Sequence, residues 1–186
     1  MLDTTETTVP ILRLRDAGGD EVSVLDGRTR MLARPDEVGD AYAVLEQFIP
    51  PGKRPPLHVH AHETEIFYIV QGRFQLSVGW ERVQAGPDAC LVGPRGIPHT
   101  FRNVGEDTGI LHLTVLPGRF GHCCLRVDAI HDQDRAAIEA LLAEYDVSVV
   151  DPAWTTGSEG RAGNDGMNAA TPDAAAPDGR RREPHL

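Results

Sequence analysis

Short runs of alternating apolar and polar residues, separated by turn-forming residues, constrain the fold of this chain more than any other feature. The runs are rich in β-branched and aromatic residues and lie at 41–49, 65–70, 73–78, 89–92, 99–104 and 110–116. Glycine and proline are frequent in the intervals between them, as is typical of strands joined by tight turns. At least six strands at spacings of about 8–12 residues predict an all-β fold, either an antiparallel sandwich or a barrel.

One helix is predicted after the strands, at 132–146. Asp132 or Asp134 can cap its N-terminus, and the apolar residues from Ile138 to Tyr145 recur at the i, i+3, i+4, i+7 spacing. Such a helix presents a single apolar stripe, which we expect to pack against the barrel. A short extended piece, VSVV, follows it.

The composition changes sharply near Trp154. Residues 155–186 contain no Ile, Val, Phe, Tyr or Trp, so they cannot bury enough apolar surface to offset their ordering entropy, and we predict a disordered tail. The rest of the chain is interpreted as an N-terminal segment with strands at 1–37, a single barrel at 38–117 and a C-terminal extension with the helix at 118–154.

Charge and cysteine usage limit the partners and the compartment. The formal net charge of −10 at pH 7 argues against nucleic acid or an anionic membrane as the main partner. The sequence has no apolar run of about 18 residues and no N-terminal signal-peptide pattern. Cys90, Cys123 and Cys124 form no CxxC pair, and the adjacent pair favours buried packing over a redox role. We expect a cytoplasmic protein that acts on a small-molecule substrate.

Three histidines and one glutamate cluster in the strand region. His58 and His60 are two residues apart in an extended segment, so both imidazoles project from the same face. Glu65 opens the next strand and can point inward, whereas His99 follows a proline–glycine turn on a distant strand. These side chains converge only if the sheet curls, as it does in a closed barrel.

Such a set has the chemistry of a metal site. Neutral imidazoles with one carboxylate suit a divalent transition metal ion, namely Fe, Mn, Ni, Co, Cu or Zn, whereas a closed structural zinc site more often uses cysteine. With all four side chains as ligands, two positions of an octahedron stay open for water, O2 or substrate oxygens. A surface histidine cluster or a vestigial site is the alternative interpretation.

Two motifs resemble those of the cupin superfamily. The first motif is matched by Gly52-x5-His58-x-His60-x4-Glu65-x6-Gly72. The second is matched by Pro94-x-Gly96-x2-His99-x3-Asn103, with Asp88 where a glycine is expected before it. The resemblance implies a conserved double-stranded β-helix (jelly-roll) barrel over about 38–117, followed by one C-terminal α-helix. It also implies that His58, His60, Glu65 and His99 are the metal ligands.

The residues in and around these motifs are similar to those of two groups of cupins. One group is small single-domain cupins related to bacterial flavonol (quercetin) dioxygenases, and the other is cupins of secondary metabolism. The resemblance makes a dioxygenase the first hypothesis for the function. In such an enzyme, Glu65 would also accept a proton from the substrate hydroxyl. A redox-neutral cyclase, isomerase or decarboxylase of a natural-product pathway is the second hypothesis, and a non-catalytic ligand-binding barrel is the third. Small cupins of this kind are usually dimers, and pairing would protect open edge strands, so we expect a homodimer.

Further residues are candidates for contact with the substrate. Phe67, Phe74 and Phe101 can form an apolar pocket wall, with plain core packing as the alternative. Gln47, or its neighbour Glu46, could place a polar group near the metal.

Three more polar residues lie near the motifs or on a later strand. His112 could point into the cavity or be an ordinary strand histidine, because the alternation of its strand does not say which face is inside. His62 and Glu63 lie on the predicted bend after His60, and both are expected at the surface.

Overall fold

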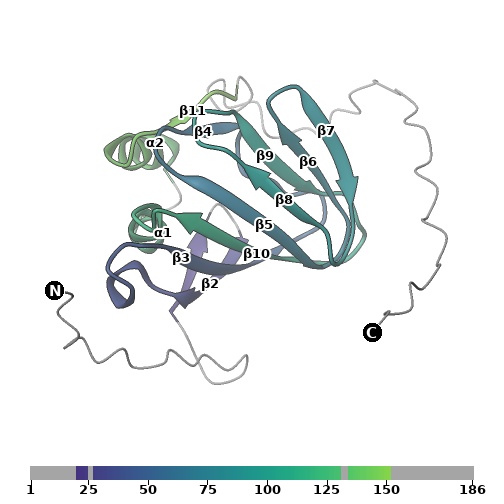
Figure 1. The fold of residues 1–186 in the computed structure, drawn as a ribbon, viewed down its shortest axis with the longest axis horizontal. Coiled ribbons are helices and arrows are strands. Elements are labelled where there is room, and N and C mark those ends of the chain that lie inside the picture. Colours follow the sequence, from purple (N-terminus) through teal and green to yellow (C-terminus); the bar gives the residue numbers. More distant parts are fainter. Residues whose placement is uncertain (1–19, 25–26, 131–133, 152–186) are drawn as a thin grey trace, which may run out of the picture.

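The computed structural model describes residues 20–24, 27–130 and 134–151, within which eleven strands and two α-helices are found (Figure 1). The strands are β1 (Glu21–Val24), β2 (Gly27–Ala33), β3 (Ala43–Ile49), β4 (His58–His60), β5 (Thr64–Gln71), β6 (Phe74–Val78), β7 (Glu81–Ala85), β8 (Cys90–Gly93), β9 (His99–Asn103), β10 (Gly109–Leu116) and β11 (Val147–Val149). The helices are α1 (Phe120–Val127) and α2 (Arg135–Glu144), and a 3-10 turn spans Pro35–Glu37.

The strands form two antiparallel sheets that pack face to face as a sandwich. One sheet has the order β1-β2-β3-β10-β5-β8 and the other the order β11-β4-β9-β6-β7. This arrangement confirms the predicted all-β jelly-roll fold. Each of the six predicted runs contains a strand: β3, β5, β6, β8, β9 and β10. The sequence pattern did not predict β7, because this edge strand is mostly exposed and therefore lacks apolar–polar alternation.

The core lies between the two sheets and follows the alternation of the strands. In β10, Leu111, Leu113 and Val115 are buried, whereas the alternate residues His112 and Thr114 are partly exposed. The main cluster of buried residues comprises Met31, Ala43, Leu45, Ile49, Phe67, Ile69, Phe74, Leu76, Phe101, Leu111, Leu113, Val115 and Cys124. Since β10 pairs with both β3 and β5, it fixes the register of the central strands on which this core is built.

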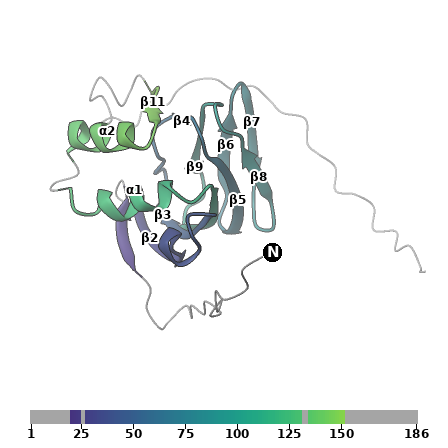
Figure 2. The same cartoon turned by 60° about the vertical axis from the view of Figure 1, so that its left-hand side comes forward.

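Two helices cover one end of the sandwich, where a single helix was predicted (Figure 2). The N-terminus of α2 is capped by Asp134, whose carboxylate accepts a hydrogen bond from the backbone N–H of Ala136 at 2.9 Å. Helix α2 falls within the predicted 132–146, although residues 131–133 lie outside the described part. Helix α1 was missed because its N-cap Arg119 makes no capping hydrogen bond, so the pattern had no start signal.

The division of the chain at residues 38, 118 and 155 stays a prediction, and the tail predicted at 155–186 lies outside the described residues. No helix in the described part is long and apolar enough to cross a membrane. The cytoplasmic location also stays a prediction.

Asn103, the last residue of the second motif, has a structural role. Its fully buried amide donates hydrogen bonds to the carbonyl oxygens of Ile49 and Asp107, each at 2.8 Å, and accepts one from the N–H of Gly105 at 2.9 Å. These bonds connect the end of β9 to the end of β3 and to the turn before β10. The opposite end of β9, which carries His99, is thereby held in register with the rest of the barrel.

Two turn positions explain other features of the motifs. Gly72 has φ +92°, and a Cβ there would lie 2.8 Å from the Cα of Gly109, so both the left-handed backbone and the close approach require glycine. Asp88 stands where the second motif has a glycine, and it adopts φ +67°. Aspartate tolerates this conformation better than most residues, and its carboxylate accepts a 2.7 Å hydrogen bond from the Tyr68 hydroxyl.

We predict that Gly72→Ala lowers the free energy of unfolding by about 3 kcal/mol or more, because left-handed strain of ~1–2 kcal/mol adds to the clash with Gly109. The matched control is Gly39→Ala, where φ is +58° and nothing lies within 4 Å of the new Cβ. Urea denaturation should show a loss of only about 1 kcal/mol for the control. Equal losses for the two variants would contradict the proposed packing of the turn on β10.

Candidate metal centre

Four polar side chains from three strands meet inside the sandwich, near its helix-covered end. His58 and His60 lie on β4 and His99 on the neighbouring β9, where His58 and His99 are paired in register. Glu65 lies at the start of β5, in the opposite sheet. One donor atom of each residue lies within 4.8 Å of the others, which confirms the predicted convergence.

Backbone carbonyl groups orient two of the imidazoles. Nδ1 of His58 lies 2.8 Å from the carbonyl oxygen of Pro56, and Nδ1 of His99 lies 2.8 Å from that of Ile97. A carbonyl oxygen only accepts hydrogen bonds, so in each ring Nδ1 carries a proton and donates it. This arrangement leaves Nε2 of His58 and His99 as the nitrogen available to a metal.

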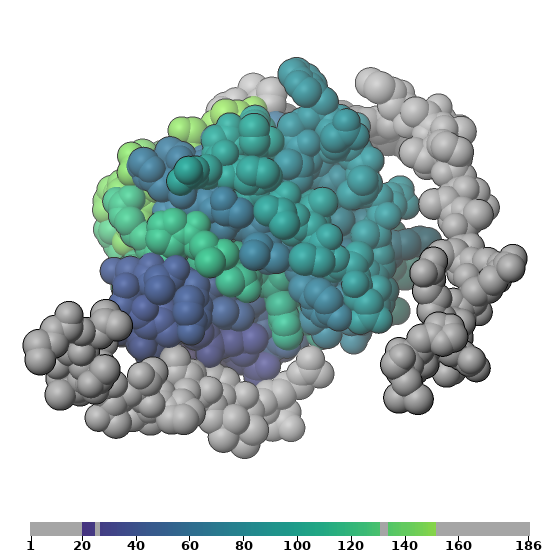
Figure 3. Space-filling model, viewed as in Figure 1, coloured from purple at the N-terminus to yellow at the C-terminus, as the bar shows by residue number. Residues whose placement is uncertain are grey.

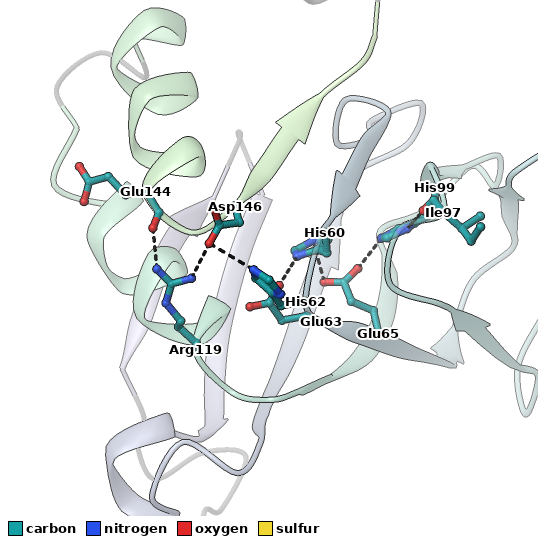
Figure 4. A network of polar contacts seen from close by, with 9 residues as sticks. All are labelled: His60, His62, Glu63, Glu65, Ile97, His99, Arg119, Glu144 and Asp146. Atoms are coloured by element: carbon teal, nitrogen blue, oxygen red, sulfur yellow. Dashed lines mark hydrogen bonds and ion pairs between the residues drawn. The ribbon is translucent and has the colours of Figure 1, made fainter.

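The Glu65 carboxylate lies between two of the imidazoles (Figure 4). Its Oε2 is 2.9 Å from Nε2 of His99, and its Oε1 is 3.5 Å from Nε2 of His60. Burial alone raises the pKa of Glu65, but electrostatic interaction with His60, the hydrogen bond from His99 and the smaller electrostatic effects of His99 and His58 together lower it to about 2. The carboxylate is therefore ionised at neutral pH, which is the form that binds a cation.

The histidines differ in their electrostatic environment. Burial, together with the neighbouring His60 and His99, lowers the pKa of His58 to about 3, so that imidazole is neutral. Burial also lowers the pKa of His99, but its hydrogen bond to Glu65 and the charge of that carboxylate outweigh this effect and raise it above the ordinary value. Without a metal, the contact with Glu65 therefore favours the protonated form of the His99 imidazole.

The four residues fit a single divalent metal ion. They supply three imidazole nitrogens and a carboxylate, all suited to a borderline transition metal. Both ring nitrogens of His60 are buried and have no hydrogen-bond partner among the described residues. Buried polar atoms are normally satisfied, and a cation at the centre of the cluster would satisfy Nε2 of His60.

A cavity adjoins the cluster and is bordered by His58 and Glu65. Gln47, Phe101, Lys53 and Arg54 also line it. The remaining walls are largely apolar and come from the N-terminal strands, the barrel and both helices: Val24, Ile49, Leu113, Phe120, Cys124, Val127, Ile138 and Leu142. Figure 3 shows the N-terminal strands and the helical segment packed against the barrel at this end of the molecule.

The structure separates the predicted substrate contacts into two groups. Gln47 and Phe101 line the cavity, whereas Phe67 and Phe74 do not and instead pack in the core. The Phe67 ring lies 6.0 Å from the His99 ring and 5.8 Å from the Phe101 ring, centroid to centroid. For Phe67 and Phe74, the alternative of plain core packing therefore describes the structure better.

His112 lies on the outer face of its sheet and does not line the cavity. Its Nε2 is 3.2 Å from Oε1 of Glu46, which is also paired with Arg30 at 2.5 Å. The pairing of β10 with β3 sets His112 opposite Glu46, and both point away from Leu111 and Leu113 in the core. The structure therefore agrees with the interpretation of His112 as an ordinary strand histidine.

On the bend after His60, the structure confirms the predicted exposure of one residue and corrects that of another. His62 is exposed, as expected, and its Nε2 lies 3.5 Å from a carboxylate oxygen of Asp146. Glu63 was expected at the surface but is fully buried. Its spacing of two residues from the inward-facing Glu65 was a signal that the two side chains share a face.

The cavity walls supplied by the helices were also missed. Phe120, Cys123, Cys124 and Val127 follow the i, i+3, i+4, i+7 spacing in the sequence, which could have identified α1. Phe120 also contacts the cluster directly, because its ring lies edge-on to His60 with 4.4 Å between centroids.

Comparisons with known proteins agree with this geometry. The family model Cupin_2, described as a cupin domain, matches residues 45–116. A protein named polyketide synthase CurC from Streptomyces cyaneus is 31% identical over 115 residues, covering 59% of this chain and 75% of that protein. An uncharacterized protein from Streptomyces coelicolor is 33% identical over 52 residues, 28% of this chain and 49% of that protein.

A solved structure shares the fold at low sequence identity. It is a predicted oxalate decarboxylase from Thermotoga maritima, with a TM-score of 0.53 and 18% identity, and the match covers 58% of this chain and 99% of that one.

We predict that metal binding displaces a proton from His99. Because the pKa of His99 is raised, its imidazole is protonated below that pKa, and the apparent metal affinity should fall about tenfold per pH unit as the pH drops further. Titration calorimetry in two buffers of different ionisation enthalpy would count the released protons. His62→Ala, on the exposed bend, should leave the profile unchanged. An affinity independent of pH between about 5.5 and 7.5 would contradict this account.

Proposed function

We propose that this chain, which belongs to the cupin family, is a metal-dependent enzyme acting on a small, oxygenated and mostly apolar organic molecule. The observation that carries the proposal is the position of His58 and Glu65 in the wall of a cavity that is otherwise largely apolar. A substrate in this cavity would contact the polar cluster at one end and hydrocarbon side chains elsewhere. Sites for small molecules commonly combine apolar walls with a few convergent polar groups.

His58, His60, Glu65 and His99 would hold the ion, which when bound would supply Lewis acidity and coordination positions for oxygen ligands. The cavity walls would exclude water and orient the substrate. Glu65 borders the cavity, where it would accept a proton from a substrate hydroxyl.

A dioxygenase is the first candidate for the reaction. Three imidazoles and one carboxylate can hold redox-active ions such as Fe, Mn, Ni, Co or Cu as well as zinc. The substrate would then be a flavonol-like or catechol-like molecule that is oxidised or cleaved with O2. The motif resemblance to flavonol dioxygenases and the apolar cavity support this candidate.

A redox-neutral cyclase, isomerase or decarboxylase is the second candidate, and the similarity to a protein named polyketide synthase CurC favours it. Polyketides carry carbonyl and enol oxygens on a largely hydrocarbon frame, which suits the same cavity. A Lewis acid that stabilises an enolate needs no O2.

The test is turnover by protein reconstituted separately with each of the six ions. Flavonols, catechols and polyphenolic polyketides would be incubated in air and under argon, with an oxygen electrode and mass spectrometry as readouts. Substrate-dependent O2 uptake supports the dioxygenase, and turnover under argon supports the redox-neutral enzyme. Saturable binding without turnover under either atmosphere would overturn the enzymatic proposal in favour of a ligand-binding barrel.

Gln47 is proposed to bind a substrate hydroxyl, because its Oε1 is buried beside the cavity and accepts no hydrogen bond among the described residues. Gln47→Leu should raise KM about tenfold, the equivalent of one hydrogen bond, with little change in kcat or metal content. Gln84→Leu, on the exposed strand β7, is the control and should leave both constants unchanged. An unaltered KM in Gln47→Leu would show that Gln47 does not bind a substrate hydroxyl.

A homodimer is also proposed. The edge strands β7 and β8 and the exposed Tyr68, Val92 and Leu116 give the chain surfaces that pairing would cover. Sedimentation equilibrium should give about twice the 20.2 kDa chain mass, and a monomer at all concentrations would refute the dimer.

A further inference from the structure

Glu63 is a buried acid to which the proposed function assigns no role. It lies on the bend between β4 and β5 and is fully buried, and neither carboxylate oxygen has a hydrogen-bond partner among the described residues. The nearby Cys123 offers no compensating charge, because a thiol is either neutral or negative; burial raises its pKa to about 12, which keeps it neutral. A buried carboxylate without hydrogen bonds is unfavourable and needs an explanation.

The explanation lies in the position of His60. Oε2 of Glu63 is 3.5 Å from Nδ1 of His60, whereas the other ring nitrogen, Nε2, faces Glu65 at 3.5 Å (Figure 4). His60 therefore lies between two carboxylates, one inside the metal cluster and one behind it. Among the described residues, His60 is the group of opposite potential charge that comes within ion-pair distance of Glu63.

The group that faces Nδ1 distinguishes His60 from the other two imidazoles of the cluster. His58 and His99 direct Nδ1 at backbone carbonyl oxygens, and only His60 directs Nδ1 at a charged side chain. A carboxylate behind a ligating imidazole holds the proton on the far nitrogen and makes the near nitrogen a stronger donor.

We propose that Glu63 is a positioning residue: once a metal binds Nε2 of His60, Glu63 accepts a hydrogen bond from Nδ1–H of that ring and thereby strengthens Nε2 as a ligand. This inference rests on the proposed metal site and extends it to a residue outside the ligand set. It explains why the acid is buried, since its negative charge is compensated only through His60 and the cation on the other side of that ring.

The proposal requires opposite effects on the metal-free and the metal-loaded protein. Without metal, the Glu63 carboxylate is a buried polar group without a hydrogen bond, so replacing it with an apolar side chain should not destabilise the fold. With metal, the loss of the carboxylate should weaken binding. A residue with a purely structural role would instead affect both forms of the protein in the same direction.

The test measures the affinity for Co(II) by competition with a chelator, together with the visible absorption of the bound ion. Glu63→Leu should weaken binding by about 10-fold to 100-fold and alter the absorption, while the metal-free variant melts at or above the wild-type temperature. Glu63→Gln keeps an acceptor for Nδ1–H but loses the charge, so its affinity should lie between those of wild type and Glu63→Leu.

Glu46→Gln is the matched control. Glu46 is equally inaccessible, with 2% exposure, but it is paired with Arg30 and His112 on the outer face of the sheet. This variant should lower the melting temperature of the metal-free protein and leave the affinity for Co(II) unchanged.

Three results would overturn the proposal, and they can be told apart. Wild-type affinity in both Glu63 variants would show that Glu63 does not act through His60. A loss of affinity accompanied by a lower melting temperature of the metal-free Glu63→Leu protein would make its role structural. Failure of the wild-type protein to bind Co(II) would overturn the metal site itself. If the wild-type protein binds Co(II) and His58→Ala abolishes that binding, the metal site is supported whatever the Glu63 variants show.

Discussion

The burial of one carboxylate among three imidazoles is the constraint on which the rest of this structure depends. Glu65 is 2% exposed, and removing such a group from water is unfavourable unless hydrogen bonds or opposite charge replace the water. His99 supplies one such contact at 2.9 Å, and a divalent cation would supply the rest. The register of β4 with β9 and the opposing position of β5 place these groups together, and Asn103 holds the other end of β9.

The helical end of the molecule borders a largely apolar cavity beside this cluster. Helices α1 and α2 supply much of the apolar cavity wall, yet both lie outside the residues matched by the cupin family model. Asp146, which follows α2, contacts His62 on the bend beside the cluster and Arg119 at the start of α1 (Figure 4). Glu144 of α2 also pairs with Arg126 of α1. The four-residue cluster therefore lies within the residues matched by the family model, whereas much of the cavity wall comes from C-terminal elements outside them.

The sequence predicted those features that follow from a strict local period. The i, i+2 spacing of His58 and His60 placed both imidazoles on one face, and the alternation of the strands predicted a sandwich or a barrel. The jelly-roll topology and the complete set of four residues were predicted from the motif resemblance. The burial of Glu63 was missed because this residue was assigned to the bend, although it continues the alternation of the following strand back from Glu65. The orientation of His112 could not be predicted, because alternation defines two faces without saying which is inside. Helix α1 lacks a capping signal, so the part of the cavity wall that it supplies was not predicted either.

The most direct test of the central claim is to locate the metal by anomalous diffraction from crystals of the protein reconstituted with Fe, Mn, Ni, Co, Cu or Zn, with data collected at the absorption edge of the added ion. The account predicts one strong anomalous peak per chain, within bonding distance of His58, His60, Glu65 and His99, with Nε2 of each imidazole facing it. No peak with any of the six ions, or a peak that excludes Glu65 and His99, would contradict it.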